Sequence, residues 1–139
     1  MHPVLRGVVG VVAGLIVGAV LVGAVQMVAH MMYATVTPVD RTDRAAVERF
    51  IAALPIGAFV MILLAYFIGT FVGSSVASRI GRSTIPGLIV AVLLFGGALS
   101  NLFTIPHPTW MIVAVPLVSG TAGFMALKLS SALRSVAAA

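Results

Sequence analysis

Six side chains in this sequence could contact a small ligand, and all of them lie in or beside long apolar segments. They are two amides, two imidazoles, a phenol and an indole: Gln26, Asn101, His30, His107, Tyr66 and Trp110. Polar groups inside a membrane are candidates for function because burying them in hydrocarbon has a high cost. The sequence therefore predicts one outward-facing polar pocket at these residues. The alternative is that they bond to one another and only fix the helices.

Two of these residues, Tyr66 and Asn101, lie in apolar segments where their polar groups need a hydrogen-bond partner. Tyr66 lies deep in an apolar segment, whereas tyrosine prefers the membrane interface, so its hydroxyl is expected to bond inside the protein. An Asn101 amide left without partners would cost several kcal/mol in hydrocarbon, so it should face another helix or the outer interface. The hydroxyls of Ser74 and Ser78 are expected to bond to their own backbone or to a neighbour.

The sequence gives little support for a metal site or for an enzyme active site. A site built on His30 and His107 would need Asp40, Asp43 or Glu48 as its third ligand, and no metal-ligand spacing motif is present. The same two imidazoles could instead sense pH, because histidine titrates near neutrality. The chain has no cysteine and no nucleophile, zinc-protease or phosphate-loop motif. We expect no catalytic residue, no metal and no cofactor, and hence a protein that is not an enzyme.

The composition indicates which elements position these side chains. Of 139 residues, 61% are hydrophobic and only 8% are charged, far from the roughly 25% charged residues of soluble domains. A helix needs about 20 apolar residues to cross a bilayer. The sequence predicts an all-α membrane protein, a single domain over 1–139 that forms a four-transmembrane-helix bundle with short loops. The expected spans are 4–32, 56–80, 85–104 and 109–133.

Small residues recur every fourth position in the first two spans. The first span contains the row Gly10, Gly14 and Gly18, and the second contains the row Ala65, Gly69, Gly73 and Ala77. Small side chains at this spacing let helix backbones approach closely in lipid. The two rows are predicted to pack helices, either against each other or against another copy or another membrane protein.

The segment 40–54 is the only strongly polar one and is predicted to be an amphipathic helix at the membrane surface. Asp40 or Thr42 is expected to cap its start. Two pairs of opposite charges four residues apart, Asp40 with Arg44 and Arg44 with Glu48, would stabilise it.

The basic residues indicate an orientation rather than a nucleic-acid partner. The net charge is +5, but the bases stand at the ends of apolar runs. Five of them fall on the side of both termini, so the positive-inside rule predicts an inner-membrane protein with cytoplasmic ends. Four of the five are expected to gather anionic lipid headgroups: Arg79, Arg82, Lys128 and Arg134.

The layout of the chain resembles a group of small bacterial four-helix integral membrane proteins. The resemblance is carried by four short-looped spans, by the row that precedes Arg79 and above all by the turn from Ile105 to Trp110, IPHPTW. It implies the four-helix fold and no established activity. The two small-residue rows, and not the resemblance, lead us to expect a structural or assembly protein that packs through them. The alternatives are an oligomeric channel or carrier for a small solute and a ligand-binding or sensor protein with an outward-facing pocket.

Overall fold

The computed structural model describes residues 2–33, 40 and 42–137. Its helices are α1 (Pro3–Tyr33), α2 (Arg44–Ala53), α3 (Ile56–Gly81), α4 (Thr84–Thr104) and α5 (Met111–Ala137). The described residues form no strand, so the predicted all-α fold class is confirmed. Four of the helices are long and apolar enough to cross a membrane, which is the architecture of a multi-pass membrane protein.

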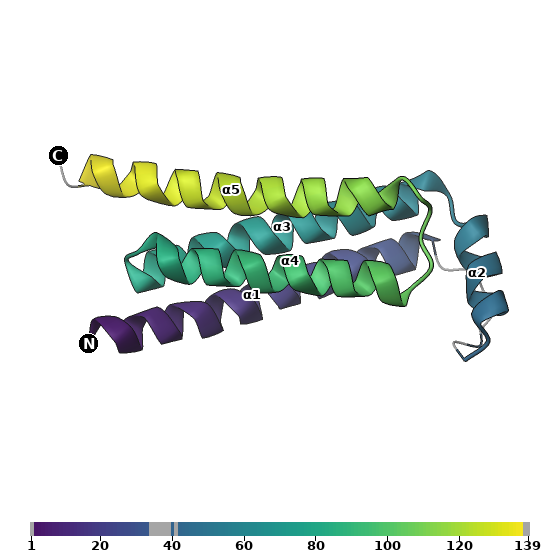
Figure 1. Cartoon of the computed structure of the whole chain (residues 1–139), viewed down its shortest axis with the longest axis horizontal. Helices are drawn as coiled ribbons and strands as arrows, with labels where there is room; N and C mark the ends of the chain where they lie inside the picture. The colour runs from purple at the N-terminus through teal and green to yellow at the C-terminus, as the bar shows by residue number, and fades with distance from the viewer. Residues whose placement is uncertain (1, 34–39, 41, 138–139) are drawn as a thin grey trace.

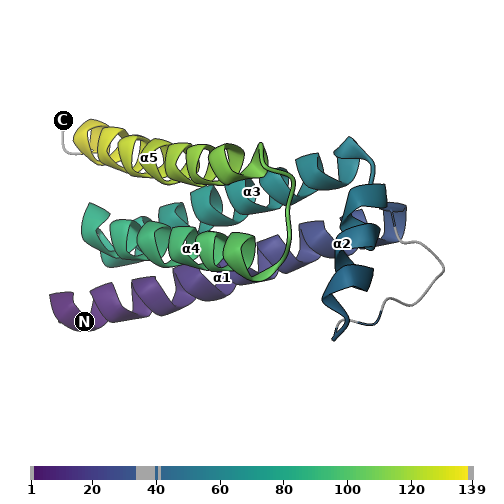
Figure 2. The same cartoon turned by 45° about the vertical axis from the view of Figure 1, so that its right-hand side comes forward.

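The four long helices run side by side, and the short α2 lies across one end of the bundle (Figures 1 and 2). The start of α1 and the end of α5 lie at the opposite end (Figure 1). Both α3 and α4 contact the other three long helices, and α3 has the most buried residues. The outward faces carry large apolar side chains, among them Ile16 at 59%, Val92 at 59% and Val113 at 69% exposure. This pattern suits lipid rather than water around the bundle.

A tight turn joins α3 to α4. Arg82 ends α3 in the left-handed region with φ of 51°, and its N–H reaches the carbonyls of Ser78 and Arg79. Ser83 then caps α4 by accepting a hydrogen bond from the amide of Ile85 at 3.3 Å. Two carbonyls at the end of α3 and one amide at the start of α4 are thus satisfied within a few residues.

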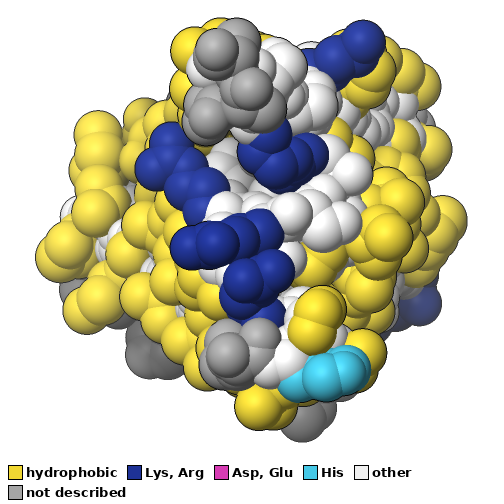
Figure 3. Space-filling model, turned by 90° about the vertical axis from the view of Figure 1, so that its left-hand side faces the viewer, with side chains coloured by type: hydrophobic (Ala, Val, Ile, Leu, Met, Phe, Trp, Pro, Cys, Tyr) yellow, Lys and Arg dark blue, Asp and Glu magenta, His cyan; other side chains and the backbone are white. Residues whose placement is uncertain are grey.

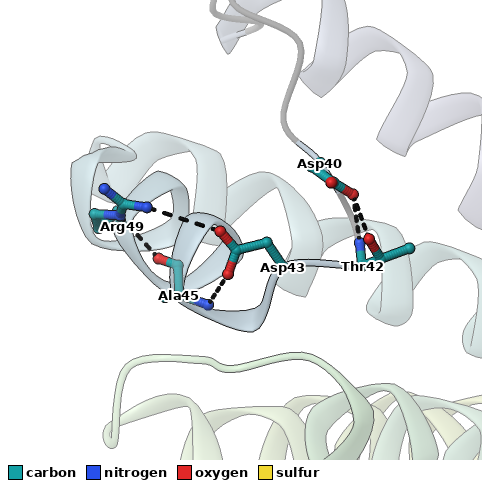
Figure 4. A network of polar contacts seen from close by, with 5 residues as sticks. All are labelled: Asp40, Thr42, Asp43, Ala45 and Arg49. Atoms are coloured by element: carbon teal, nitrogen blue, oxygen red, sulfur yellow. Dashed lines mark hydrogen bonds and ion pairs between the residues drawn. The ribbon is translucent and has the colours of Figure 1, made fainter.

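The polar segment differs in detail from the sequence prediction. The helix begins at Arg44 and not near 40, because Asp43 is the cap and accepts from the amide of Ala45 at 2.9 Å (Figure 4). Asp40 and Thr42, the predicted caps, bond to each other instead: the Asp40 carboxylate accepts from the Thr42 amide at 2.9 Å and hydroxyl at 2.7 Å. Their side chains are therefore already used in a local turn.

Ion pairs on α2 follow the predicted spacing only in part. Arg44 pairs with Glu48 at 3.1 Å, as predicted. Asp40, the second partner predicted for Arg44, is instead hydrogen-bonded to Thr42. A pair that was not predicted joins Arg49 to Asp43, with 3.9 Å between the guanidinium nitrogen and the carboxylate oxygen. These side chains are at least half exposed, so the pairs contribute little stability.

An apolar cluster fills the end of the bundle next to α2. Its buried members come from α3, α4 and α5: Phe59, Tyr66, Ala98, Leu102, Met111 and Val115. Ile51 and Leu54 pack against this cluster. The apolar stripe of the amphipathic helix therefore holds α2 onto the bundle end and positions the short turn before α5 beside it.

Candidate functional site

The two small-residue rows face each other inside the chain. A Cβ placed on Gly10 would lie 2.7 Å from the carbonyl oxygen of Ala77, and one on Gly18 would lie 2.9 Å from that of Gly69. Between them, a Cβ on Gly73 would lie 2.6 Å from the carbonyl oxygen of Gly14. Numbers rise along α1 as they fall along α3, so the helices are antiparallel. Glycine is required here because one backbone packs directly on the other.

Tyr66 and Asn101 form a direct pair. The side-chain amide of Asn101 donates to the Tyr66 hydroxyl at 2.5 Å, and Tyr66 is buried with 7% of its surface exposed. The residues are 35 positions apart and join α3 to α4. Each therefore supplies the partner that the other needs in an apolar interior.

Trp110 and His107 lie in the turn between α4 and α5. The Trp110 ring meets the buried Phe59 ring edge-on, with centroids 6.0 Å apart, and remains 41% exposed. The Nδ1 atom of His107 lies 2.7 Å from the carbonyl oxygen of Ile105. His107 also lines an open groove with Glu48 of α2. The turn thus sits between the bundle end and the amphipathic helix.

Gln26 and His30 lie in the last two turns of α1. Gln26 is half-buried and His30 is exposed. Four of the grooves on the described surface are not lined by Gln26, His30, Tyr66 or Asn101. The structure brings Tyr66 and Asn101 together but does not gather all six predicted residues around one of these grooves.

Three buried serines depart from the expected pattern. Ser75 bonds back to the carbonyl of Phe71 at 2.7 Å, as a hydroxyl in a membrane helix commonly does. Ser74, Ser78 and Ser119 are at most 1% exposed, and their hydroxyls have no partner among the described residues.

The signal for a polar face on α3 was present in the sequence. Tyr66, Thr70, Ser74 and Ser78 recur every fourth residue, directly beside the small-residue row. All four are buried. Two adjacent stripes on one helix, one of small residues and one of hydroxyls, indicate that both faces are covered by other helices.

The basic residues divide between two grooves. Three of the four predicted headgroup ligands line one groove between α3 and α5, which we call the basic groove: Ser78, Arg79, Arg82, Ser130, Leu133 and Arg134. Lys128 instead lines a groove between α4 and α5, where its Nζ lies 5.5 Å from the centre of the Phe124 ring. Figure 3 shows the end of the bundle with these side chains, where dark-blue Lys and Arg gather and no acidic side chain is visible.

This division of the bases follows from helix geometry. Lys128 and Arg134 are six residues apart on α5, which corresponds to about 240° around a helix. The two side chains are thus about 120° apart around α5 and project from different faces, which agrees with their lining different grooves.

No protein-family model matches the chain, and no curated protein or solved structure does either. The resemblance to small bacterial four-helix membrane proteins with an IPHPxW turn therefore stays a prediction. The residues themselves carry the functional argument.

Proposed function

We propose that this chain is a structural or assembly protein of the cell membrane that associates with a second copy of itself. The predicted small-residue rows on α1 and α3 pack against each other within one chain and are not free to contact a second copy. The proposed contact is therefore a different surface, which we call the α4 face: Gly96, Gly97, Ser100 and Thr104.

One observation carries this proposal. All four residues of the α4 face are exposed, and a Cβ added at Gly96 or Gly97 would meet no described atom within 4 Å. At 100° per residue the four lie within an arc of about 100° on the outer half of α4. Each glycine costs a helix about 1 kcal/mol relative to alanine. Close approach of another helix would offset that cost, since small residues are the preferred contact in lipid.

The proposal includes a location and an orientation. We place the protein in the inner membrane with both termini in the cytoplasm. Support comes from the basic side chains Arg6, Arg79, Arg82, Lys128 and Arg134, which belong to the end of the bundle that carries both termini. An excess of basic residues is typical of the cytoplasmic side.

Cysteine cross-linking tests the contact directly, because the natural chain contains no cysteine. We expect Ser100→Cys on the α4 face to form a disulfide-linked dimer when membranes are oxidised. Val113→Cys is the matched control, since Val113 lies on α5 near the same end of the bundle and is 69% exposed. Equal yields from the two variants, or a monomeric mass for the unmodified protein in native mass spectrometry, would overturn the proposal.

A second pair of variants tests the glycines. Gly97→Leu should lower the dimer fraction by filling the α4 face while leaving the helical content of the chain unchanged. Gly120→Leu on α5 is the control, because Gly120 is also exposed and a Cβ there would also meet no described atom within 4 Å. An identical dimer fraction in both variants would contradict a role for the α4 face.

A further inference from the structure

The net charge of the chain belongs to one end of the molecule. All three acids lie within residues 40–49, where three arginines, Arg41, Arg44 and Arg49, balance them. The formal charge of +5 is therefore carried by the five remaining bases, which belong to the end shown in Figure 3. No Asp or Glu lies near those bases in the sequence, and none is visible among the described residues on that surface.

The basic groove concentrates three of these charges. It is a depression of about 270 Å³ between the last turns of α3 and α5. Arg79 and Arg82 are exposed and Arg134 is half-buried. The carbonyl ends of α3 and α5 contribute about half a negative charge each. Three full guanidinium charges exceed that, so the groove favours an anion.

The floor and the wall of the groove indicate what kind of anion fits. Ser130 lines it and is only 6% exposed. Ser78 also lines it, but the Ser78 hydroxyl is buried against Gly87 of α4 and is not offered to the groove. Leu133 forms an apolar wall and is 47% exposed, and Leu129, one turn deeper along α5, is 43% exposed. A ligand with a charged head at the arginines and a hydrocarbon tail along these leucines would satisfy both parts.

We infer that the basic groove binds the phosphate of an anionic phospholipid, with its acyl chain lying along α5. Arginine suits this role because its planar fork donates two parallel hydrogen bonds to a phosphate. The headgroup lies at the depth where membrane helices end, so the lipid reaches the groove from its own leaflet. This inference requires the chain to be a membrane protein but does not depend on the α4 face.

Native mass spectrometry of the purified protein with phosphatidylglycerol tests the inference. We expect one lipid to be retained per chain and phosphatidylcholine to be lost. Each arginine near an anionic lipid contributes roughly fivefold in affinity, so Arg82→Gln with Arg134→Gln should weaken phosphatidylglycerol binding about 25-fold. The control, Arg44→Gln with Arg49→Gln, changes the total charge equally at the other end and should leave binding unchanged.

Three outcomes would overturn the inference. One is an equal loss of lipid in the two double variants, which would show a response to total charge alone. Another is binding of many lipids per chain without saturation. The third is displacement of phosphatidylglycerol by equimolar inorganic phosphate, which would make free phosphate the ligand. Gly97→Leu should retain the lipid, so a failure of self-association and a failure of lipid binding are distinguishable.

Discussion

Replacing Gly14 by alanine is the most direct test of the contact between α1 and α3. The new Cβ would lie 2.5 Å from the carbonyl oxygen of Gly73 and 2.7 Å from the Cβ of Ala77. Ordinary contacts begin near 3.4 Å, so the two helices would have to separate by roughly 0.7–0.9 Å. Overpacking of this kind costs about 1–3 kcal/mol, and the better helix propensity of alanine returns up to about 1 kcal/mol. We expect a net loss of about 1–2 kcal/mol.

The same helix provides the control. Gly23 also lies on α1, is exposed, and a Cβ there would meet no described atom within 4 Å. Gly23→Ala should therefore leave the free energy of unfolding unchanged or raise it by up to about 1 kcal/mol. Both variants can be unfolded with dodecyl sulfate in mixed micelles, followed by circular dichroism and by the emission of the single tryptophan, Trp110. If Gly14→Ala proves as stable as Gly23→Ala, the backbone contact does not hold α1 against α3.

Three further predictions concern polar side chains. Tyr66→Phe should lower the free energy of unfolding by about 1 kcal/mol by leaving the Asn101 amide unpaired, and adding Asn101→Leu should recover part of the loss; strictly additive effects in the same titration would argue against the pair. Hydrogen bonds from the Thr42 hydroxyl and, to a lesser extent, from the Thr42 amide hold the pKa of Asp40 below its ordinary value. The turn is therefore fully stabilised when the pH is above the ordinary pKa of an aspartate, and this stabilisation is lost as the pH falls through the lowered pKa of Asp40. Thr42→Val should raise the pKa of Asp40, measured by carboxyl NMR, and an unchanged titration would count against the bond. Ser119→Ala removes a buried hydroxyl that has no partner among the described residues and should be neutral or stabilising by up to about 1 kcal/mol; a clear loss of stability would mean that the hydroxyl has a partner.

The bundle could be predicted from the sequence because long apolar runs have one stable solution in lipid. The prediction stopped the last span at Leu133, the last large apolar residue before Arg134. The helix continues to Ala137 because no glycine or proline interrupts it and the backbone still gains its hydrogen bonds. Hydropathy therefore marks the membrane-buried part of a helix and not its end.

Pairing between helices was harder to predict. Spacing identified the small-residue rows, but Gly14 and Gly73 are far apart in the chain, and only the packing of α1 on α3 joins them. The same holds for Tyr66 and Asn101, each of which was predicted to need a partner. The sequence indicates that a buried polar group needs a hydrogen-bond partner. Which residue provides that partner depends on how the two helices are rotated relative to each other.

The candidate site shows a sharper limit. Ser74 and Ser75 are neighbours of the same type, yet only Ser75 bonds to its own helix. They differ because they point to different sides of α3, toward different surroundings. The division of Lys128 from Arg134, by contrast, could have been deduced from their six-residue separation on one helix.

The uneven distribution of charge along the bundle restricts how two copies could meet. Carrying one elementary charge across a membrane potential of 100 mV costs about 2.3 kcal/mol. In a membrane with such a potential, an upside-down copy with five uncompensated positive charges would be disfavoured by on the order of 12 kcal/mol. If two copies associate as proposed, we expect them to stand the same way up, related by a rotation axis perpendicular to the bilayer. Any α4 to α4 contact would be parallel, whereas the glycine contact within each chain is antiparallel.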